Sequence, residues 1–570
     1  MYIDIVPNRG SRPAILLRET HREGEKVIKH TLANLSSLPL DQVEAIRRIL
    51  KGEKLVQPTE LFEVISSAQH GNVEAVLTAM RQLEFEKLIA SRSSRERDLV
   101  VAMVAARIME PDSKLATTRW WQNTTLPDIM GVSDATEVDL YEAMDWLLER
   151  QDIIEKKLSV RHLTEGGLVL YDLTSSYFEG KCCPLAALGH NRDGKKGKLQ
   201  VNYGLLTDSR GAPVAVSVFK GNTGDPKTLM PQVEMIRKKF GITEMVLIGD
   251  RGMISQKHIN DLKGQDGINW ITAMKSSAIQ KLVNGDALQL GLFDERNLFE
   301  FTNPDYPGER LIACRNPELA KQRDHKRRAL LDATNKELDK VKKMVESGRL
   351  KGKDQIGVRV GKVVNKYKMA KHLTLEILDN SFSWQVKEDK VMEEGCLDGV
   401  YVIRTSLSRD RISSEDTVRR YKDLSQVEQA FRSFKSIDLE VRPIQHHLEN
   451  RVRAHIFLCM LAYYVKLHMQ EALRPLTFAD EDLKAKQTRD PVAPAKRSKK
   501  AIEKARTKKL KDGTKVHSFQ TLLNSLNTIV RNVCRYKNEE SDTPVFNMET
   551  TPSANQQKIF NLLGTIKCTQ

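Results

Sequence analysis

The sequence has few cysteines and no long apolar run. Its 7 cysteines are scattered over 570 residues without a C-x-x-C pair, so neither a zinc finger nor a disulfide framework is indicated. The longest apolar run, IFLCMLAYYVKL from Ile456, is shorter than the roughly 20 residues of a membrane-spanning helix. The first residues lack the apolar stretch of a secretory signal. These absences predict a protein of a reducing cytoplasm that does not enter a membrane.

Acidic side chains are outnumbered by basic ones. The chain has 91 Lys and Arg against 75 Asp and Glu, a formal net charge of +16. Such a surplus favours a polyanionic partner, nucleic acid above all, although a ribosome-associated or membrane-surface protein also fits the charge. Because single hydrophobic cores stop growing near roughly 250 to 300 residues, we expect several domains.

The hydrophobic period changes near residue 40. Residues 1–40 alternate apolar and polar side chains, which predicts a small β-meander. Residues 41–160 carry apolar side chains three and four positions apart, which predicts helices. We interpret this helical region as the part that binds DNA ends, with plain helical packing as an equally good reading of any one helix.

The period changes again after residue 160. In residues 161–275, three strand-like runs are joined by short links and two further strands alternate with helices, which is the order of a ribonuclease H-like sheet. Residues 276–399 predict a β-rich inserted subdomain, residues 400–480 the second part of the sheet domain, and residues 481–570 a basic linker and C-terminal tail. The predicted fold class is therefore α/β, a ribonuclease H-like mixed sheet interrupted by a β-rich insertion and preceded by a mainly helical region.

Two aspartates end predicted buried strands. Asp172 closes GLVLYDLT, and Asp250 closes EMVLIGD. A lone aspartate at such a place more often begins a turn or caps a helix. An unpaired carboxylate in apolar surroundings is costly, however, and metal coordination is one way to offset that cost. The first and fourth strands of a ribonuclease H-like sheet are neighbours, so we expect these two carboxylates to share metal ions.

A third carboxylate, Glu428, lies on the helix predicted after the insertion. On a helical wheel an apolar stripe begins at Leu424, and one edge of it is lined by Tyr421, Glu428, Arg432 and Lys435. The alternative is an exposed pair of Glu428 with Arg432 on a solvated face. Three converging carboxylates fit two-metal phosphoryl transfer, because hard oxygen ligands hold Mg²⁺ and leave positions for water and phosphate oxygens. The basic and phenolic neighbours of Glu428 would then position phosphates.

With these residues the sequence resembles the transposases of bacterial insertion sequences of the IS-four superfamily. YDLTSSYFEG is similar to the first-Asp motif of that family, and LIGDRGM to the second. The Tyr-Arg-Glu-Lys signature maps to Tyr421, Leu424, Glu428 and Lys435, so the signature Arg is replaced by Leu424. Arg432, one turn after the glutamate, is the candidate substitute for that Arg.

The resemblance implies a DDE transposase. It assigns catalysis and metal binding to Asp172, Asp250 and Glu428, with Mg²⁺ as cofactor and Mn²⁺ able to replace it. The implied partner is double-stranded DNA, namely terminal inverted repeats and target DNA, bound by a homodimer in a synaptic complex. The implied location is the bacterial cytoplasm, at the nucleoid. Two other functions stay open: a ribonuclease H-like nuclease that does not join strands, and an inert transposase-derived DNA-binding protein.

Two further residues are candidates for contacts with DNA. Relatives stack an aromatic residue of the insertion on a flipped base, and the resemblance makes Trp384 the candidate, although a Trp in an alternating strand is more often a core residue. Arg251, next to Asp250, is a candidate for a phosphate contact. His446 and His447 do not predict a metal site, because adjacent side chains point in different directions.

Overall fold

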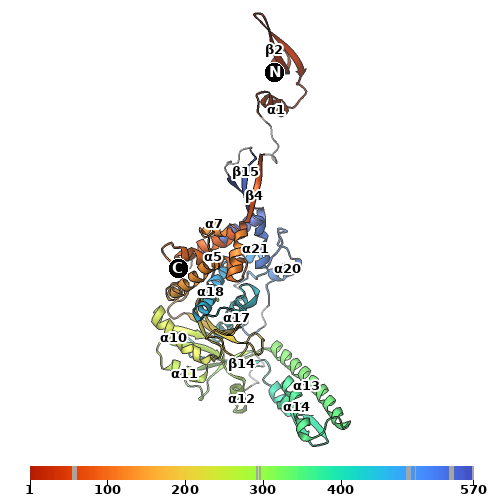
Figure 1. Cartoon of the computed structure of the whole chain (residues 1–570). Coiled ribbons are helices and arrows are strands. Elements are labelled where there is room, and N and C mark those ends of the chain that lie inside the picture. The colour runs from red at the N-terminus through yellow and green to blue at the C-terminus, as the bar shows by residue number, and fades with distance from the viewer. Residues whose placement is uncertain are drawn as a thin grey trace. The chain divides into compact units, whose positions relative to one another are not determined.

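The computed structural model describes residues 1–53, 61–289, 293, 297–482, 489–493, 496–537 and 545–567. The chain divides into two compact units (Figure 1). Unit 1 contains Met1–Ala68 and Val530–Thr550, and unit 2 contains Gln69–Ile529 and Thr551–Gln570. Each unit therefore takes segments from both halves of the sequence.

Unit 1 contains two three-stranded sheets. The first is an antiparallel meander of β1 (Tyr2–Asn8), β2 (Ser11–Glu23) and β3 (Lys26–Asn34), followed by α1 (Leu40–Leu50). Its alternating sequence suits a strand, because successive side chains point to opposite faces. The second sheet has the order β16-β15-β4 and consists of β4 (Phe62–Gln69), β15 (Val530–Tyr536) and β16 (Val545–Glu549).

The second sheet corrects two expectations. Residues 41–160 are not helical throughout, because β4 lies among them. Residues 481–570 are not simply a linker and tail, because they hold β15, β16, α20 (Lys499–Thr507), α21 (Phe519–Asn524), a 3₁₀ turn (Ser525–Thr528) and α22 (Ala554–Leu563). Part of the predicted linker, residues 483–488, lies outside the described residues. Basic side chains here form ion pairs, as Arg535 does with Glu63 and Arg531 with Glu549, so high charge does not mark an unfolded arm.

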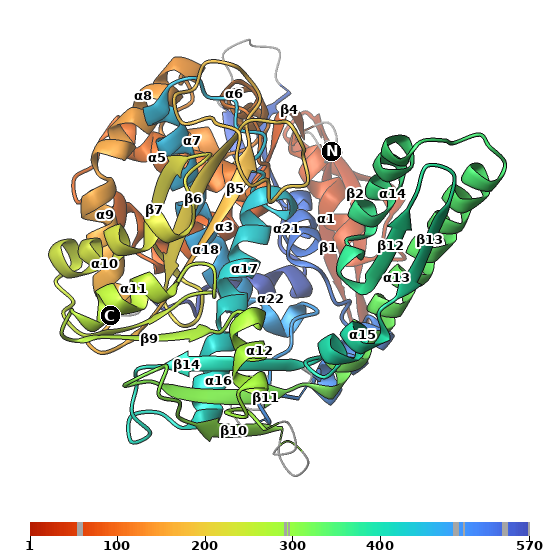
Figure 2. The same ribbon diagram turned by 90° about the horizontal axis from the view of Figure 1, so that it is seen from below.

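The centre of unit 2 is an eight-stranded mixed sheet (Figure 2). Five strands have the order β7-β6-β5-β8-β9, in which β5 pairs antiparallel with β6 and β6 with β7, whereas β5, β8 and β9 pair in parallel. This is the ribonuclease H-like order predicted from the sequence. The strands are β5 (Leu168–Tyr177), β6 (Gln200–Thr207), β7 (Pro213–Lys220), β8 (Met245–Ile248) and β9 (Ile268–Ala273), with α10 (Pro226–Phe240) and α11 (Gln256–Lys263) between them.

Three antiparallel strands extend this sheet beyond β9. In order from β9 they are β14 (Val400–Thr405), β11 (Arg310–Arg315) and β10 (Leu298–Phe301), and α12 (Ser276–Asn284) precedes them in the chain. Between β11 and β14 the chain forms an inserted lobe with a hydrophobic core of its own. The lobe consists of α13 (Pro317–Glu346), α14 (Lys353–Tyr367), a 3₁₀ turn (Ala370–His372), β12 (Leu373–Ile377), β13 (Phe382–Val386) and α15 (Glu388–Gly395).

The lobe is more helical than predicted. Its main elements are α13, with 30 residues, and α14, which lie side by side in both views, whereas β12 and β13 form only a two-stranded sheet (Figures 1 and 2). Two strand-like runs of residues 276–399, LFEFTN from Leu298 and RLIACRN from Arg310, belong to the main sheet and not to the lobe. The apolar residues of α13 are widely spaced between charged residues. Only one narrow face of the helix is therefore apolar, and this face packs against α14.

The helical part of unit 2 surrounds α18 (Glu449–Ala472). This helix is buried along most of its length, as expected for a helix that is apolar on all sides. It packs against β7 and against α3 (Gly71–Gln82), α5 (Arg95–Met109) and α8 (Glu137–Glu149). The remaining helices are α4 (Phe85–Ile89), α6 (Lys114–Trp120), α7 (Leu126–Met130) and α9 (Gln151–His162), with 3₁₀ turns at Trp121–Asn123 and Arg474–Leu476. No helix among the described residues is long and apolar enough to cross a membrane.

The helix predicted after the insertion is divided into parts. It consists of α16 (Ser414–Lys422), α17 (Leu424–Arg432) and a π-helical turn (Ser433–Ile437). The Ser413 hydroxyl caps α16 by accepting a hydrogen bond from the Asp416 N–H at 3.0 Å. Asp423 separates α16 from α17, so Tyr421 and Glu428 lie on different helices.

Candidate active site

Two neighbouring parallel strands place Asp172 beside Asp250. The register of β5 and β8 pairs Leu170 with Ile248. Asp172 and Asp250 each lie two residues further along, so they stand at the same level. Asp250 follows the end of β8, but Asp172 lies within β5, which continues to Tyr177, so the prediction that Asp172 ends its strand is wrong. The predicted convergence of these aspartates is therefore a consequence of strand register.

Each aspartate uses one carboxylate oxygen to hold the local backbone. Asp172 Oδ1 accepts a hydrogen bond from the Leu173 N–H at 2.8 Å. Asp250 Oδ1 accepts from the N–H groups of Gly252 at 2.9 Å and Met253 at 2.7 Å. Within the described residues the second oxygen of each carboxylate has no hydrogen-bond partner, which leaves a hard oxygen donor for a cation.

Glu428 reaches the same region from α17, which packs on β5. Burial raises the pKa of Asp172 to about 7, and the negative charges of Asp250 and Glu428 act in the same direction. Arg192 and the Leu173 N–H oppose this pKa shift. A like charge nearby disfavours ionisation of a carboxyl group, which is the direction of this pKa shift.

Tyr421 belongs to this group of interacting side chains. Its phenol is partly buried, and burial raises its pKa to about 12, with the charges of Asp250, Glu428 and Asp172 adding to the effect. Arg251, which directly follows Asp250, opposes that pKa shift.

In the part of the chain that the structure describes, no three His, Cys, Asp or Glu side chains are near enough together to hold a metal ion. The donor set, three carboxylates of which two have an oxygen without a hydrogen bond, fits a hard divalent ion.

The remaining predicted DNA contacts are distributed differently. Arg432 is exposed on α17. Lys435 is not free, because its ammonium forms an ion pair with Asp193 at 2.9 Å. Trp384 lies in the core of the inserted lobe, where its indole N–H donates to Asn335 at 3.0 Å and its ring stacks on Phe382. Trp384 therefore belongs to the inserted lobe and not to the sheet that carries Asp172.

The loop between β5 and β6 adds residues that sequence reasoning missed. Asp193 is buried and pairs with Arg442 as well as Lys435, and its other oxygen accepts from the Tyr177 N–H. Arg192 pairs with Asp225 before α10, and its charge acts on Asp172. The segment NRDGKKGK carries turn residues and basic residues, which indicate a loop but not its partners.

Two family models match the chain. The model described as Transposase DDE domain matches residues 167–465, and the model described as IS1634 family transposase, N-terminal domain, matches residues 3–60. No curated protein matches. Among solved structures, the cryo-EM structure of a piggyBac transposase synaptic complex with hairpin DNA is similar at 10% identity and a TM-score of 0.34, over 80% of this chain and 79% of that one. A likeness this distant carries no argument.

The DDE domain match covers more than half of the chain and contains Asp172, Asp250 and Glu428. Members of this family cleave and transfer DNA strands with divalent metal ions. The chain therefore belongs to the DDE transposases of insertion sequences.

Proposed function

We propose that the protein cuts and rejoins DNA at the ends of its own element, with Asp172, Asp250 and Glu428 as the ligands of two Mg²⁺ ions. The placement of Asp172 beside Asp250 on parallel strands, with the charge of Glu428 acting on Asp172, carries the proposal. Mn²⁺ also suits these oxygen ligands and is expected to replace Mg²⁺. The bound ions would activate the attacking oxygen and stabilise the leaving 3′-oxygen.

The chain's own residues have separate tasks in this reaction. Asp172 and Asp250 would bind the metals through the oxygens that accept no hydrogen bond. Arg251 and Arg432 would hold phosphate oxygens, since both are exposed and basic. Lys435 would act as a positioning residue, because its ammonium holds Asp193 and with it the loop after β5. These residues bind and orient DNA without exchanging protons with it.

We also propose that the chain belongs to the IS-four superfamily. Tyr421, Glu428 and Lys435 support assignment to the IS-four superfamily, whereas Leu424 packs against the hydrophobic core and offers no phosphate contact. Stacking of Trp384 on a flipped base stays a prediction that requires its ring to leave Phe382.

The proposed substrate is double-stranded DNA, first the terminal inverted repeats and then the target. A net charge of +16 supports binding to this polyanion. Two element ends must be joined in one event, so we propose a homodimer that pairs them in the bacterial cytoplasm, at the nucleoid. Residues 41–160 are the proposed region for binding DNA ends.

Nicking of duplex DNA that carries the element's ends tests the site. We expect the full-length protein to nick this DNA with Mg²⁺, and Asp172→Ala, Asp250→Ala or Glu428→Ala each to abolish nicking while end binding persists. Glu234→Ala, which removes an exposed carboxylate from α10, is the matched control and keeps full activity. Nicking at the wild-type rate by any of the three variants would reject that ligand.

An assay of strand joining distinguishes a transposase from a nuclease that only cuts DNA. Supplying pre-cleaved ends and supercoiled target DNA should give joined products with the wild-type protein. Cleavage without joined products would favour a ribonuclease H-like nuclease. End binding without either reaction would favour the inert DNA-binding protein.

A further inference from the structure

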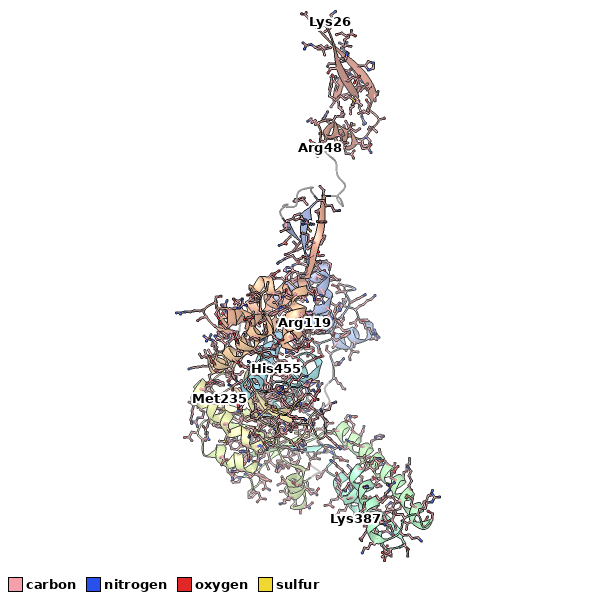
Figure 3. All side chains as sticks on the ribbon, viewed as in Figure 1. Lys26, Arg48, Arg119, Met235, Lys387 and His455 are labelled. Carbon is pink, nitrogen blue, oxygen red and sulfur yellow. The ribbon has the colours of Figure 1, made fainter. Side chains whose placement is uncertain are left out.

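A second basic site lies in the helical part of unit 2. It is a pocket of about 600 Å³ formed by α5, α6, α8, the start of α18 and the segment that leads into α18. Figure 3 labels one of its residues, His455 on α18. The basic side chains that line the pocket are Arg107, Lys114, Arg442, Arg451, His446 and His455.

Lys114 is buried in this pocket without a partner. Only 4% of the residue is exposed, and within the described chain its ammonium forms no hydrogen bond or ion pair. Burial lowers the pKa of Lys114 to about 7, and the charge of Arg107 adds to this effect. An unpaired ammonium in a protein interior is costly, so a side chain held in this way indicates a missing anion.

Other hydrogen-bond donors converge on the same space. Arg107 is 6% exposed and donates to the Asp112 carbonyl oxygen at 2.8 Å. Arg451 Nε is buried and has no hydrogen-bond partner within the described residues. Arg451 lies over the Tyr141 ring at 4.6 Å, which fixes the direction of its guanidinium. His455 donates from Nε2 to the Val441 carbonyl oxygen at 3.2 Å, so its Nδ1 is an acceptor and does not add to these donors. Three basic side chains from three helices, Lys114, Arg107 and Arg451, thus have unused donors.

Acidic residues near the pocket pair with two of its basic side chains. Asp145 lies 3.6 Å from Arg451 Nε, and Asp193 pairs with Arg442. Asp112 and Glu440 also line the pocket, but in the described structure neither forms an ion pair with Lys114 or Arg107. Burial lowers the pKa of His446 to about 3, and the charges of Lys114, Arg107 and Arg451 contribute to that shift. Lys114 and Arg107 are thus the cations of the pocket without an ion-pair partner among the described residues.

The pocket is connected to the candidate active site. Arg442 at its wall pairs with Asp193, which also binds Lys435. Ile444 pairs with the end of β5, where its N–H donates to the Tyr177 carbonyl oxygen at 3.1 Å. Tyr177 is five residues beyond Asp172, about 17 Å at ~3.3 Å per strand residue.

We propose that this pocket is a phosphate-binding site that holds a phosphate of the transposon DNA away from the bond that is cut. A phosphate presents several strong acceptor oxygens, which matches converging Lys and Arg donors. The phosphate site stands on the pocket itself, whereas DNA as the source of the phosphate rests on the proposed function. A free phosphoanion would satisfy the same donors.

Thermal unfolding of the full-length protein tests the phosphate site. Inorganic phosphate replaces chloride at constant ionic strength, and the wild-type Tm should rise with phosphate concentration. Lys114→Met should have a higher Tm than the wild type without phosphate, because it removes a buried unpaired charge. Its apparent phosphate affinity should be weaker by about tenfold or more. Lys238→Met, at an exposed lysine on α10, is the control and should respond like the wild type.

Arg451→Gln gives an independent measurement if Lys114→Met does not fold, and it should also weaken phosphate binding. Equal phosphate shifts in the wild type and in both pocket variants, or no shift in the wild type, would overturn the site. Fluorescence anisotropy with duplex end DNA then identifies the source. Reduced DNA affinity of Lys114→Met supports DNA, and unchanged DNA affinity with lost phosphate response assigns a free phosphoanion instead. Asp172→Asn should keep the phosphate response, so failure of the catalytic proposal is distinguishable from failure of the pocket.

Discussion

Asp172 is the residue at which burial and repulsion between like charges act together. Its pKa is raised from 3.8 to about 7, so between these values the folded state holds a proton that the unfolded state has lost. Stability therefore falls as pH rises from about 4 to about 7 and stays lower above that range. An ionised carboxylate that destabilises the folded protein is suited to bind a cation, because the positive charge offsets the repulsion between the carboxylates.

Asp172→Asn should stabilise the metal-free protein at alkaline pH. We expect an increase of about 1 to 3 kcal/mol in the free energy of unfolding at pH 8, after allowance for solvent screening. The increase should vanish near pH 3, where the aspartate is mostly protonated in both states. Urea unfolding in chelator at the two pH values measures it. A variant that is less stable than the wild type at pH 8 would contradict the raised pKa.

Asp193 should be a structural residue as well as a neighbour of the site. It is paired with both Lys435 and Arg442, so Asp193→Ala leaves two largely buried cations without a partner. We expect a loss of about 3 kcal/mol or more in stability. In a double-variant cycle with Lys435→Met, the combined loss should be smaller than the sum of the single losses. Additive losses would show that the two residues are not coupled.

Among the elements, the inserted lobe is the most separable. Arg315 pairs with Val400 at the ends of β11 and β14, and the Asn316 N–H donates to the Gly399 carbonyl oxygen at 2.9 Å. The lobe therefore leaves and rejoins the sheet at one hairpin position, and its hydrophobic core is distinct from that of the sheet. Gly399 has a φ of 75°, so it suits the turn at this junction.

Replacing residues 317–398 by a short turn should leave the sheet folded. We expect a monophasic unfolding transition and far-UV circular dichroism with reduced helix content, because α13 and α14 are removed. Fragmentary or aggregated product would show that the sheet depends on the lobe. Nicking by the shortened protein would further show whether the lobe takes part in the reaction.

Elements were predictable where the local pattern reflects local packing. β5 and β8 are short apolar runs buried in the sheet, and their order gave the topology that places Asp172 beside Asp250. The pairing of β4 with β15 was not predicted, because the two strands lie hundreds of residues apart in the sequence. The proposed phosphate pocket was not predicted either. His446 has no metal-ligand spacing, and no local pattern in the sequence indicates that Lys114 is buried.

For the whole molecule, the net charge of +16 predicts that the affinity for DNA depends strongly on salt concentration. Each phosphate neutralised by Lys or Arg releases a counterion, so affinity for end DNA should fall steeply with salt. If 6 to 10 phosphates are contacted, the loss between 50 and 200 mM salt is about 10³- to 10⁵-fold. Anisotropy titrations over this range measure the slope. A slope near zero would contradict binding through the basic surface.

Unit 1 draws on two segments that are made at different times. β4 ends at Gln69 and its partner β15 begins at Val530. At about 5 to 20 residues per second, the ribosome needs roughly 20 to 90 s to synthesise the intervening chain. During this time the edge of β4 has no partner, and exposed strand edges pair readily with other chains. A chain that ends before Val530 lacks β15 and β16, so it cannot form this sheet.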